Sequence, residues 1–155
     1  MFGFSVEKIE WEYGEQYGYV FYPQAFVDLQ SKIDELHSWG KTHNYPFLII
    51  LHFYDTSIYL GFTVGHEYSF MEFAYDVDAE KGKGRGPFYL VNPQGNPSEI
   101  IPIYYMASQS MLDTTKMLHY DQVLAAVYFF VNHQMFPYFI TFDQEEVNQM
   151  FIVSS

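Results

Sequence analysis

Two neighbouring apolar patterns near the middle of the chain constrain its fold most strongly. The run Phe47–Leu51 is short, continuously apolar and bounded by turn residues, as in a strand at the centre of a sheet. From Ile58 to Val64 every second residue is apolar, which is typical of a strand that buries one face and leaves the other wetter. Only a few residues, including Asp55-Thr56-Ser57, separate the two segments. They predict two adjacent antiparallel strands joined by a hairpin loop.

Further strands are expected on both sides of this hairpin. Their predicted ranges are Phe2–Tyr13, Tyr17–Tyr22, Glu67–Tyr75, Phe88–Val91, Ile100–Met106 and Tyr138–Phe142. The charged segment Asp76–Gly86 is expected to form a long loop, and Pro93–Pro97 a turn. The segment Ala107–Leu118 is expected to be irregular.

Two segments have the pattern of helices. From Gln24 to Trp39 apolar residues recur along one stripe, and Gly40 is expected to end that helix. The segment Asp121–His133 is apolar nearly all round and is expected to pack on the sheet. Six or seven strands with two principal helices predict an α+β fold with a mainly antiparallel sheet, and residues 1–155 are expected to form a single domain.

The charge of the chain limits its partners. Nineteen acidic residues stand against seven basic ones, for a formal net charge of −12. Such a protein repels nucleic acid and anionic membranes and attracts cationic partners, so we expect neither direct nucleic-acid nor membrane binding. The longest apolar run, Val123–Val131, is shorter than the roughly 20 residues of a membrane-spanning helix. Because the first residues lack the features of a secretory signal, a cytoplasmic location is expected.

Motifs for catalysis or metal binding are weak. The chain has no cysteine, and its six histidines match no metal-binding pattern, so we expect neither a metal nor a cofactor. The glycine-rich segment Gly82–Gly86 is followed by a strand-like run, which favours a hairpin tip over a phosphate-binding loop. There is no Gly-x-Ser-x-Gly motif. The main prediction is therefore that the protein is not an enzyme.

Acidic residues interleaved with aromatic ones are the best candidates for a binding surface. The chain contains 15 tyrosines and 16 phenylalanines, and acidic residues gather near its start, middle and end. Tyrosines supply contact area, while surrounding carboxylates speed encounter with a basic partner. The candidates are Glu67, Glu72, Tyr75, Asp76, Asp78 and Glu80, followed by a second group at Asp143, Glu145 and Glu146.

The second half of the chain resembles a known family. The segment Asp121–Phe130, with the sequence DQVLAAVYFF, and the later segment Phe136–Phe142, with the sequence FPYFITF, carry the resemblance within a stretch from Phe47 to Asp143. They resemble immunity protein one, a family of bacterial immunity proteins of polymorphic-toxin systems that act in interbacterial competition. The resemblance implies a cytoplasmic antitoxin that binds and neutralises a cognate toxin domain, such as a nuclease or nucleic-acid deaminase. It implies no catalytic residues.

The negative net charge of the chain also favours binding to a toxin that acts on nucleic acid. Enzymes that act on nucleic acid present cationic clefts, and an acidic protein can block such an active-site cleft. Two alternatives remain open: a small-ligand-binding domain or carboxylate-dependent hydrolase that uses Glu72 or Asp76, and a structural subunit of a homo-oligomer. The identity of the toxin, the mode of inhibition and the oligomeric state are not determined by the sequence.

Overall fold

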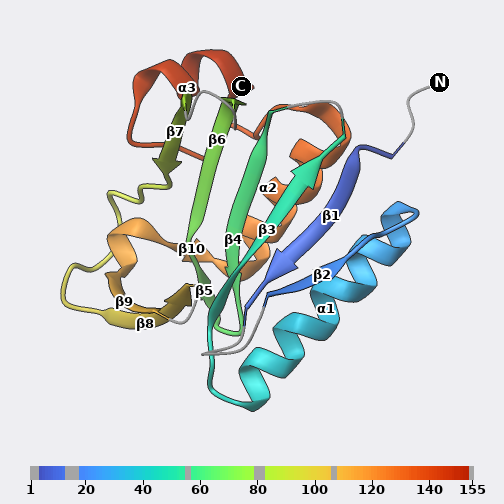
Figure 1. Ribbon diagram of the computed structural model, residues 1–155. Helices are drawn as coiled ribbons and strands as arrows, with labels where there is room; N and C mark the ends of the chain where they lie inside the picture. The colour runs from blue at the N-terminus through green and yellow to red at the C-terminus, as the bar shows by residue number, and fades with distance from the viewer. Residues whose placement is uncertain (1–3, 13–17, 55–56, 79–82, 106–107, 154–155) are drawn as a thin grey trace.

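The central element of the fold is an antiparallel sheet in the order β2-β1-β3-β4-β6-β7 (Figure 1). The computed structural model describes residues 4–12, 18–54, 57–78, 83–105 and 108–153. The strands of the main path are β1 (Val6–Trp11), β2 (Tyr19–Phe21), β3 (Phe47–Phe53), β4 (Tyr59–Val64), β6 (Met71–Asp78) and β7 (Lys83–Tyr89). The predicted central hairpin is confirmed, because β3 pairs with β4 from Phe47–Val64 to His52–Tyr59.

A second hairpin extends this sheet at one end. It consists of β8 (Ile100–Tyr105) and β9 (Ser108–Asp113), which pair in antiparallel fashion. Strand β8 joins the main sheet through a short parallel contact between Tyr104 and Phe47 at the start of β3. Two short strands, β5 (Tyr68–Ser69) and β10 (Leu118–His119), form a separate small sheet.

Two long helices cover one face of the sheet. They are α1 (Phe26–Thr42) and α2 (Tyr120–His133), and α2 passes behind β3 and β4 in Figure 1. Leu29 and Ile33 of α1 and Phe130 of α2 are fully buried in one apolar cluster with the inward side chains of the strands. A short 3-10 turn, η1 (Thr114–Lys116), and a short helix, α3 (Glu145–Phe151), complete the described elements.

Alternation along the strands divides the sheet into two faces. Phe47, Ile49 and Leu51 of β3 belong to the cluster under the helices, which we call the helix face. Leu48 belongs instead to a second, smaller cluster with Ile103 of the β8–β9 hairpin. We call this opposite side the open face, because α1 and α2 pack on the other side and, among the described elements, the hairpin and the adjoining η1 region cover part of it.

The expectation that Gly40 ends the first helix is wrong. Helix α1 continues to Thr42, and Gly40 lies inside it. A β-carbon at Gly40 would lie 2.7 Å from Cα of Gly65, so this position is a close contact between the helix and the end of β4. Gly65 has a φ of 95°, which is a backbone conformation that glycine adopts easily.

The expected long loop from Asp76 to Gly86 is also wrong in its extent. Strand β6 continues to Asp78, and β7 already begins at Lys83, so most of the described part of this segment is strand. Residues 79–82 lie outside the described residues. Gly86, which was expected at the tip of a hairpin, lies within β7 and has a φ of 108°. The open-face alternation of β4 differs as well, because Thr63 is only 1% exposed where a wetter position was expected.

Two later expectations are corrected by elements that depend on distant partners. The segment predicted as irregular contains β9 and η1, because β9 pairs with β8 along its whole length. The strand predicted from Tyr138 to Phe142 is absent from the described structure, where Phe142 makes only an isolated bridge to Leu90. Helix α3 follows it and was not predicted.

The described elements form a single α+β domain, as the pattern of strands and helices predicted. The main antiparallel sheet has eight strands when the β8–β9 hairpin is included. Within the described part of the chain, no helix combines the length and apolarity needed to cross a membrane.

Candidate functional site

The open face carries a row of polar and aromatic side chains that the helices leave uncovered. Two of the depressions along it have volumes of about 320 and 300 Å³, and both are lined in part by Tyr59. The first is lined by residues that include Lys8 and His52, and the second by residues that include Glu72 and Tyr105. The depression around Glu72 is the candidate site, and we call it the Glu72 pocket.

Glu72 is placed in this pocket by the register of the sheet. It lies on β6, opposite Gly61 on β4 and opposite Tyr89 on β7. A β-carbon at Gly61 would lie 3.1 Å from Cγ of Glu72 and 3.3 Å from its Oε1. Because Gly61 has no side chain, the Glu72 side chain can lie over β4 at this position.

The Glu72 side chain is largely buried and has no partner among the described residues. The residue is 8% exposed, and it makes no hydrogen bond or ion pair with any described residue. Burial raises the pKa of Glu72 to about 6, because an apolar environment disfavours the charged form. At neutral pH the pocket therefore holds a largely ionised carboxylate with no cationic partner among the described residues.

Three tyrosines surround this carboxylate. Tyr59 comes from β4, Tyr89 from β7 and Tyr105 from the end of β8. Burial and the nearby charge of Glu72 both raise the pKa of each of these hydroxyl groups. Phe70 stacks on Tyr89 with a centroid distance of 5.7 Å and forms part of the same wall. The arrangement is an aromatic pocket with one acidic group.

Further carboxylates extend the negative surface from the pocket toward β1. Glu10 and Glu12 act on the Tyr105 hydroxyl electrostatically and line a small depression beside it. Glu10 also lies 3.7 Å from Nε2 of His52. Burial lowers the pKa of His52, and the Glu10 carboxylate offsets part of that effect. The open face thus combines three carboxylates with exposed tyrosine rings.

Tyr75, a residue predicted to bind a partner, lies on the other side of the sheet. It is 4% exposed in the core of the helix face, and its hydroxyl donates a hydrogen bond to Oε1 of Glu146 on α3. Burial, with a contribution from Glu146, raises the pKa of Tyr75 to about 12. Nη1 of Arg85 lies 3.1 Å from the same oxygen. The structure therefore brings Tyr75 and Glu146 together in an internal contact that attaches α3 to the sheet.

The other predicted residues are scattered. Asp143 accepts a hydrogen bond from the backbone N–H of Tyr89, which ties the segment before α3 to β7. Glu67, Asp76 and Glu145 are exposed at three separate places, respectively after β4, within β6 and at the start of α3. Of the remaining two, Asp78 ends β6 with its side chain undescribed, and Glu80 lies outside the described residues. Among the described side chains of the predicted set, Glu72 is the one that lines the candidate site.

Several residues of the open face were not singled out from the sequence. Glu10 and Glu12 belong to the acidic residues near the start of the chain, and Tyr59, Tyr89 and Tyr105 are three of its 15 tyrosines; their residue types alone do not distinguish them from the others. The alternation from Ile58 to Val64 did contain a signal, because it places Tyr59 and Gly61 on the face opposite the apolar residues. The strand order needed to bring β1, β6 and β8 beside them was not available from that pattern.

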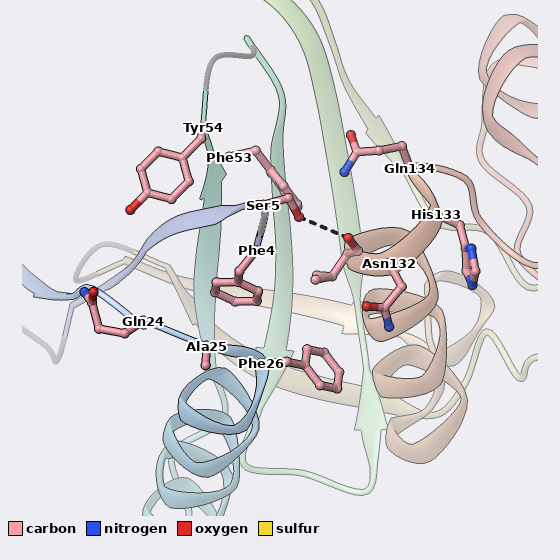
Figure 2. Close-up of a pocket in the computed structure, with 11 residues that line it drawn as sticks. Phe4, Ser5, Gln24, Ala25, Phe26, Phe53, Tyr54, Asn132, His133 and Gln134 are labelled. Atoms are coloured by element: carbon pink, nitrogen blue, oxygen red, sulfur yellow. Dashed lines mark hydrogen bonds between the residues drawn. The ribbon is translucent and has the colours of Figure 1, made fainter. Parts of the chain in front are cut away.

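A larger cleft lies elsewhere in the described structure. It has a volume of about 860 Å³ and opens between the start of α1, the end of α2 and the ends of β1 and β3 (Figure 2). Phe4 and Phe26 lie near its middle, whereas Gln24 and Tyr54 lie toward its margin (Figure 2). Its lining contains no carboxylate, lysine or arginine among the described residues. The described lining of the cleft therefore lacks a charged group, such as the carboxylate of the Glu72 pocket, that would select a ligand.

No group of three or more histidine or acidic side chains in the described parts of the chain is arranged to hold a metal ion. The histidines have other roles where the structure defines them. Nδ1 of His37 accepts a hydrogen bond from the backbone N–H of Gly65, and the His37 ring stacks on Tyr120 at 3.6 Å. His119 caps α2 by accepting a hydrogen bond from the N–H of Asp121.

In comparisons with protein-family models, curated proteins and solved structures, no match to this chain was found. The resemblance to immunity protein one stays a prediction from the sequence.

Proposed function

We propose that this chain is a non-enzymatic, cytoplasmic immunity protein that neutralises a basic toxin domain by binding it on the open face. The observation that carries the proposal is the Glu72 carboxylate, which is buried without a partner in a tyrosine-lined pocket on the face that the helices leave uncovered. Aromatic side chains around a desolvated charge are typical of the energetic centre of a protein interface.

The charge distribution supports a basic partner. Glu10 and Glu12 lie on the same face as Glu72, beside Tyr105, and the chain as a whole carries a formal charge of −12. A surface of this sign speeds association with a cationic protein and excludes nucleic acid itself. A toxin domain that acts on nucleic acid presents the complementary charge, so a nuclease or nucleic-acid deaminase is the class of toxin we propose.

Co-expression with the toxin domain encoded beside its gene tests this proposal. The wild-type chain is expected to co-purify with the toxin domain in equimolar amount and to suppress its activity. The open-face variant Glu10→Gln/Glu12→Gln/Glu72→Gln is expected to weaken binding at least about tenfold, with most of the loss at low salt.

A matched control separates the open face from overall charge. The variant Asp34→Asn/Glu67→Gln/Glu145→Gln removes the same number of charges from exposed positions on α1, after β4 and on α3. It is expected to bind within about threefold of the wild type, because the altered charges lie outside the contact. Equal weakening by both triple variants would contradict the open face as the interface, and no co-purification with any adjacent toxin would contradict the function.

A second function is favoured by one observation. A carboxyl group whose pKa is raised to about 6 can donate a proton near neutral pH, as a general acid does. The Glu72 pocket of about 300 Å³ is at the lower end of the size of small-molecule sites. Glu72 is, however, the one carboxylate among the described residues that line it, so the pair of carboxylates that glycoside hydrolases use is missing from this lining. A small molecule retained by the purified protein in native mass spectrometry would favour this alternative.

A further inference from the structure

The open face offers more than a surface of negative charge, because the Glu72 pocket has the composition of a cation-binding site. It combines one carboxylate with the aromatic rings of Tyr59, Tyr89 and Tyr105. Aromatic faces attract organic cations through their quadrupole, and a desolvated carboxylate adds a direct charge interaction. A simple acidic patch would have only the second of these features.

We propose that the Glu72 pocket receives a single organic cation, namely the side chain of a lysine or arginine that projects from the basic partner protein. This inference rests on the proposed function and specifies how the partner is anchored. The cation would insert between the tyrosines and pair with the Glu72 carboxylate at the floor of the pocket.

The burial of Glu72 is the first argument for an inserted cation. The residue is 8% exposed, and no described residue pairs with it. An ionised carboxylate in this position destabilises the folded protein until a counter-charge binds. Most of the desolvation cost of the carboxylate therefore arises in folding and not in binding. A cation that enters the pocket recovers this energy, whereas a neutral group of the same shape does not.

The arrangement around Gly61 is the second argument, because it determines where the Glu72 side chain lies in the pocket wall. Gly61 lies opposite Glu72, and the close approach of 3.1 Å to its Cγ shows that the acidic side chain occupies the space above the glycine. On the other side Tyr89 lies directly opposite Glu72 in the ladder with β7. The Glu72 side chain therefore lies over the backbone of Gly61 on one side and beside Tyr89 on the other, in the wall of a cavity of about 300 Å³.

The β8–β9 hairpin is the third argument, because it supplies the remaining wall. Ile103 packs with Leu48 and Phe70 in the cluster on the open face, which fixes the hairpin over the sheet. Tyr105 at the end of β8 then lies close enough to Glu72 for the carboxylate to raise the pKa of its hydroxyl group. Two separate parts of the chain thus converge on one carboxylate, as expected of a site that encloses a ligand.

Titration with small probes followed by backbone NMR shifts tests the pocket directly. The probes are n-butylammonium chloride, n-butylguanidinium chloride and the neutral isostere n-butanol, at constant ionic strength. Both cations are expected to shift the resonances of β6, β7 and β8, with dissociation constants of roughly millimolar size for ligands this small. n-Butanol is expected to bind at least about tenfold more weakly. Equal binding of n-butanol would overturn the proposal.

Variants identify the groups responsible. Glu72→Gln keeps the shape of the pocket and is expected to weaken butylammonium binding at least about tenfold, and Tyr89→Leu about threefold, in line with the size of cation–π interactions. Glu99→Gln, a change of the same chemistry at an exposed position before β8, is the control and is expected to leave binding unchanged. Unchanged binding in Glu72→Gln would overturn the proposal. Tyr89→Leu serves as the second test if Glu72→Gln does not fold.

A peptide arm distinguishes a partner side chain from a free small amine. The blocked peptide acetyl-Gly-Lys-Gly-amide is expected to bind as well as butylammonium, and its norleucine counterpart is expected not to bind. Binding of butylammonium without binding of the lysine peptide would overturn the assignment to a protein side chain. If the wild-type chain co-purifies with the toxin but binds none of the cations, the pocket is not a cation site, and the proposed function is unaffected. Intact cation binding without any toxin partner would contradict only the proposed function.

Discussion

Gly61 on β4 and Glu72 on β6 lie directly opposite each other, and a β-carbon on the glycine would lie 3.1 Å from Cγ of the glutamate. The same β-carbon would lie 3.4 Å from Cδ1 of Leu48. The size of the residue at position 61 thus controls where the acidic side chain of the pocket lies.

Gly61→Ala is expected to displace the Glu72 side chain with little effect on folding. The close atoms belong to flexible side chains, which can move, and alanine in a strand lowers the entropy of the unfolded state, so the free energy of unfolding should change by less than about 1 kcal/mol. Binding of butylammonium should nevertheless weaken at least about fivefold, because the carboxylate moves away from the rings. Urea unfolding and NMR titration measure the two effects, and unaltered cation binding in a folded variant would contradict the role given to Gly61.

Glu72→Gln is expected to change how stability depends on pH. The pKa of Glu72 is about 6 in the folded protein, against an ordinary value of 4.5, so between these pH values the folded state binds more protons than the unfolded state. The free energy of unfolding of the wild type should therefore fall as pH rises from 4.5 to 6, by about 2 kcal/mol from this group, since one pKa unit corresponds to about 1.4 kcal/mol.

The comparison with the variant isolates this effect. His37 and His52 have lowered pKa values, which make stability rise with pH below their ordinary value of 6.5, but they are present in both proteins. The tyrosines that face Glu72 from β4, β7 and β8 have raised pKa values and do not titrate in this range. Chemical unfolding at pH 4.5, 5.5 and 6.5 should show that the free energy of unfolding of the wild type falls relative to that of Glu72→Gln as the pH rises. The histidines act in the opposite direction and equally in both proteins. A difference that stays constant with pH would contradict an uncompensated buried carboxyl group.

Glu146→Ala is expected to destabilise the protein by about 1–3 kcal/mol. The substitution removes the acceptor of the buried Tyr75 hydroxyl and the partner of Arg85, which together attach α3 to β6 and β7. Glu145→Ala, at an exposed neighbouring position on the same helix, controls for the general effect of removing an acid there. In a double-mutant cycle with Tyr75→Phe, measured by urea unfolding, a coupling energy of at least about 0.5 kcal/mol is expected. Additive effects would show that the contact contributes nothing to stability.

Gly40→Ala is expected to destabilise the protein by about 2 kcal/mol or more. The added β-carbon would lie 2.7 Å from Cα of Gly65 and 3.0 Å from the carbonyl oxygen of Tyr45, and both are backbone atoms that cannot move aside easily. Although alanine is the better helix former, the clash should outweigh its advantage of about 1 kcal/mol. Gly18→Ala, where the nearest atom lies 3.6 Å away, is the control and should change stability by less than about 1 kcal/mol. Thermal unfolding of the two variants gives the comparison, and a Gly40→Ala protein as stable as wild type would contradict the helix–turn contact.

Elements defined by local sequence patterns could be predicted, whereas elements defined by contacts between distant segments could not. The hairpin of β3 and β4 and the helix α2 followed from local patterns: a short continuous apolar run for β3, alternation for β4 and a longer apolar segment for α2. Strand β9 and helix α3 did not, since β9 is polar and exposed along most of its length and is defined by its pairing with β8. Gly40 was misinterpreted for a similar reason, because its role depends on Gly65, which is distant in the sequence.

The candidate site followed the same division. Glu72 was identified from its place in an acidic, aromatic stretch, whereas Tyr75 from the same stretch is part of the core. Two residues three positions apart on an extended strand point to opposite faces, so closeness in sequence did not mean a shared surface.

Apolar patterns along the chain determined, from the sequence alone, that the protein has an α+β fold with a mainly antiparallel sheet and two principal helices. Only the tertiary structure decided that Glu10, Glu72 and Tyr105 lie on one surface, because they come from β1, β6 and β8. A period of two specifies which residues of one strand share a face, but the neighbours across the sheet depend on strand order and register. Those are set by contacts between distant segments, and the functional surface of this protein depends on them.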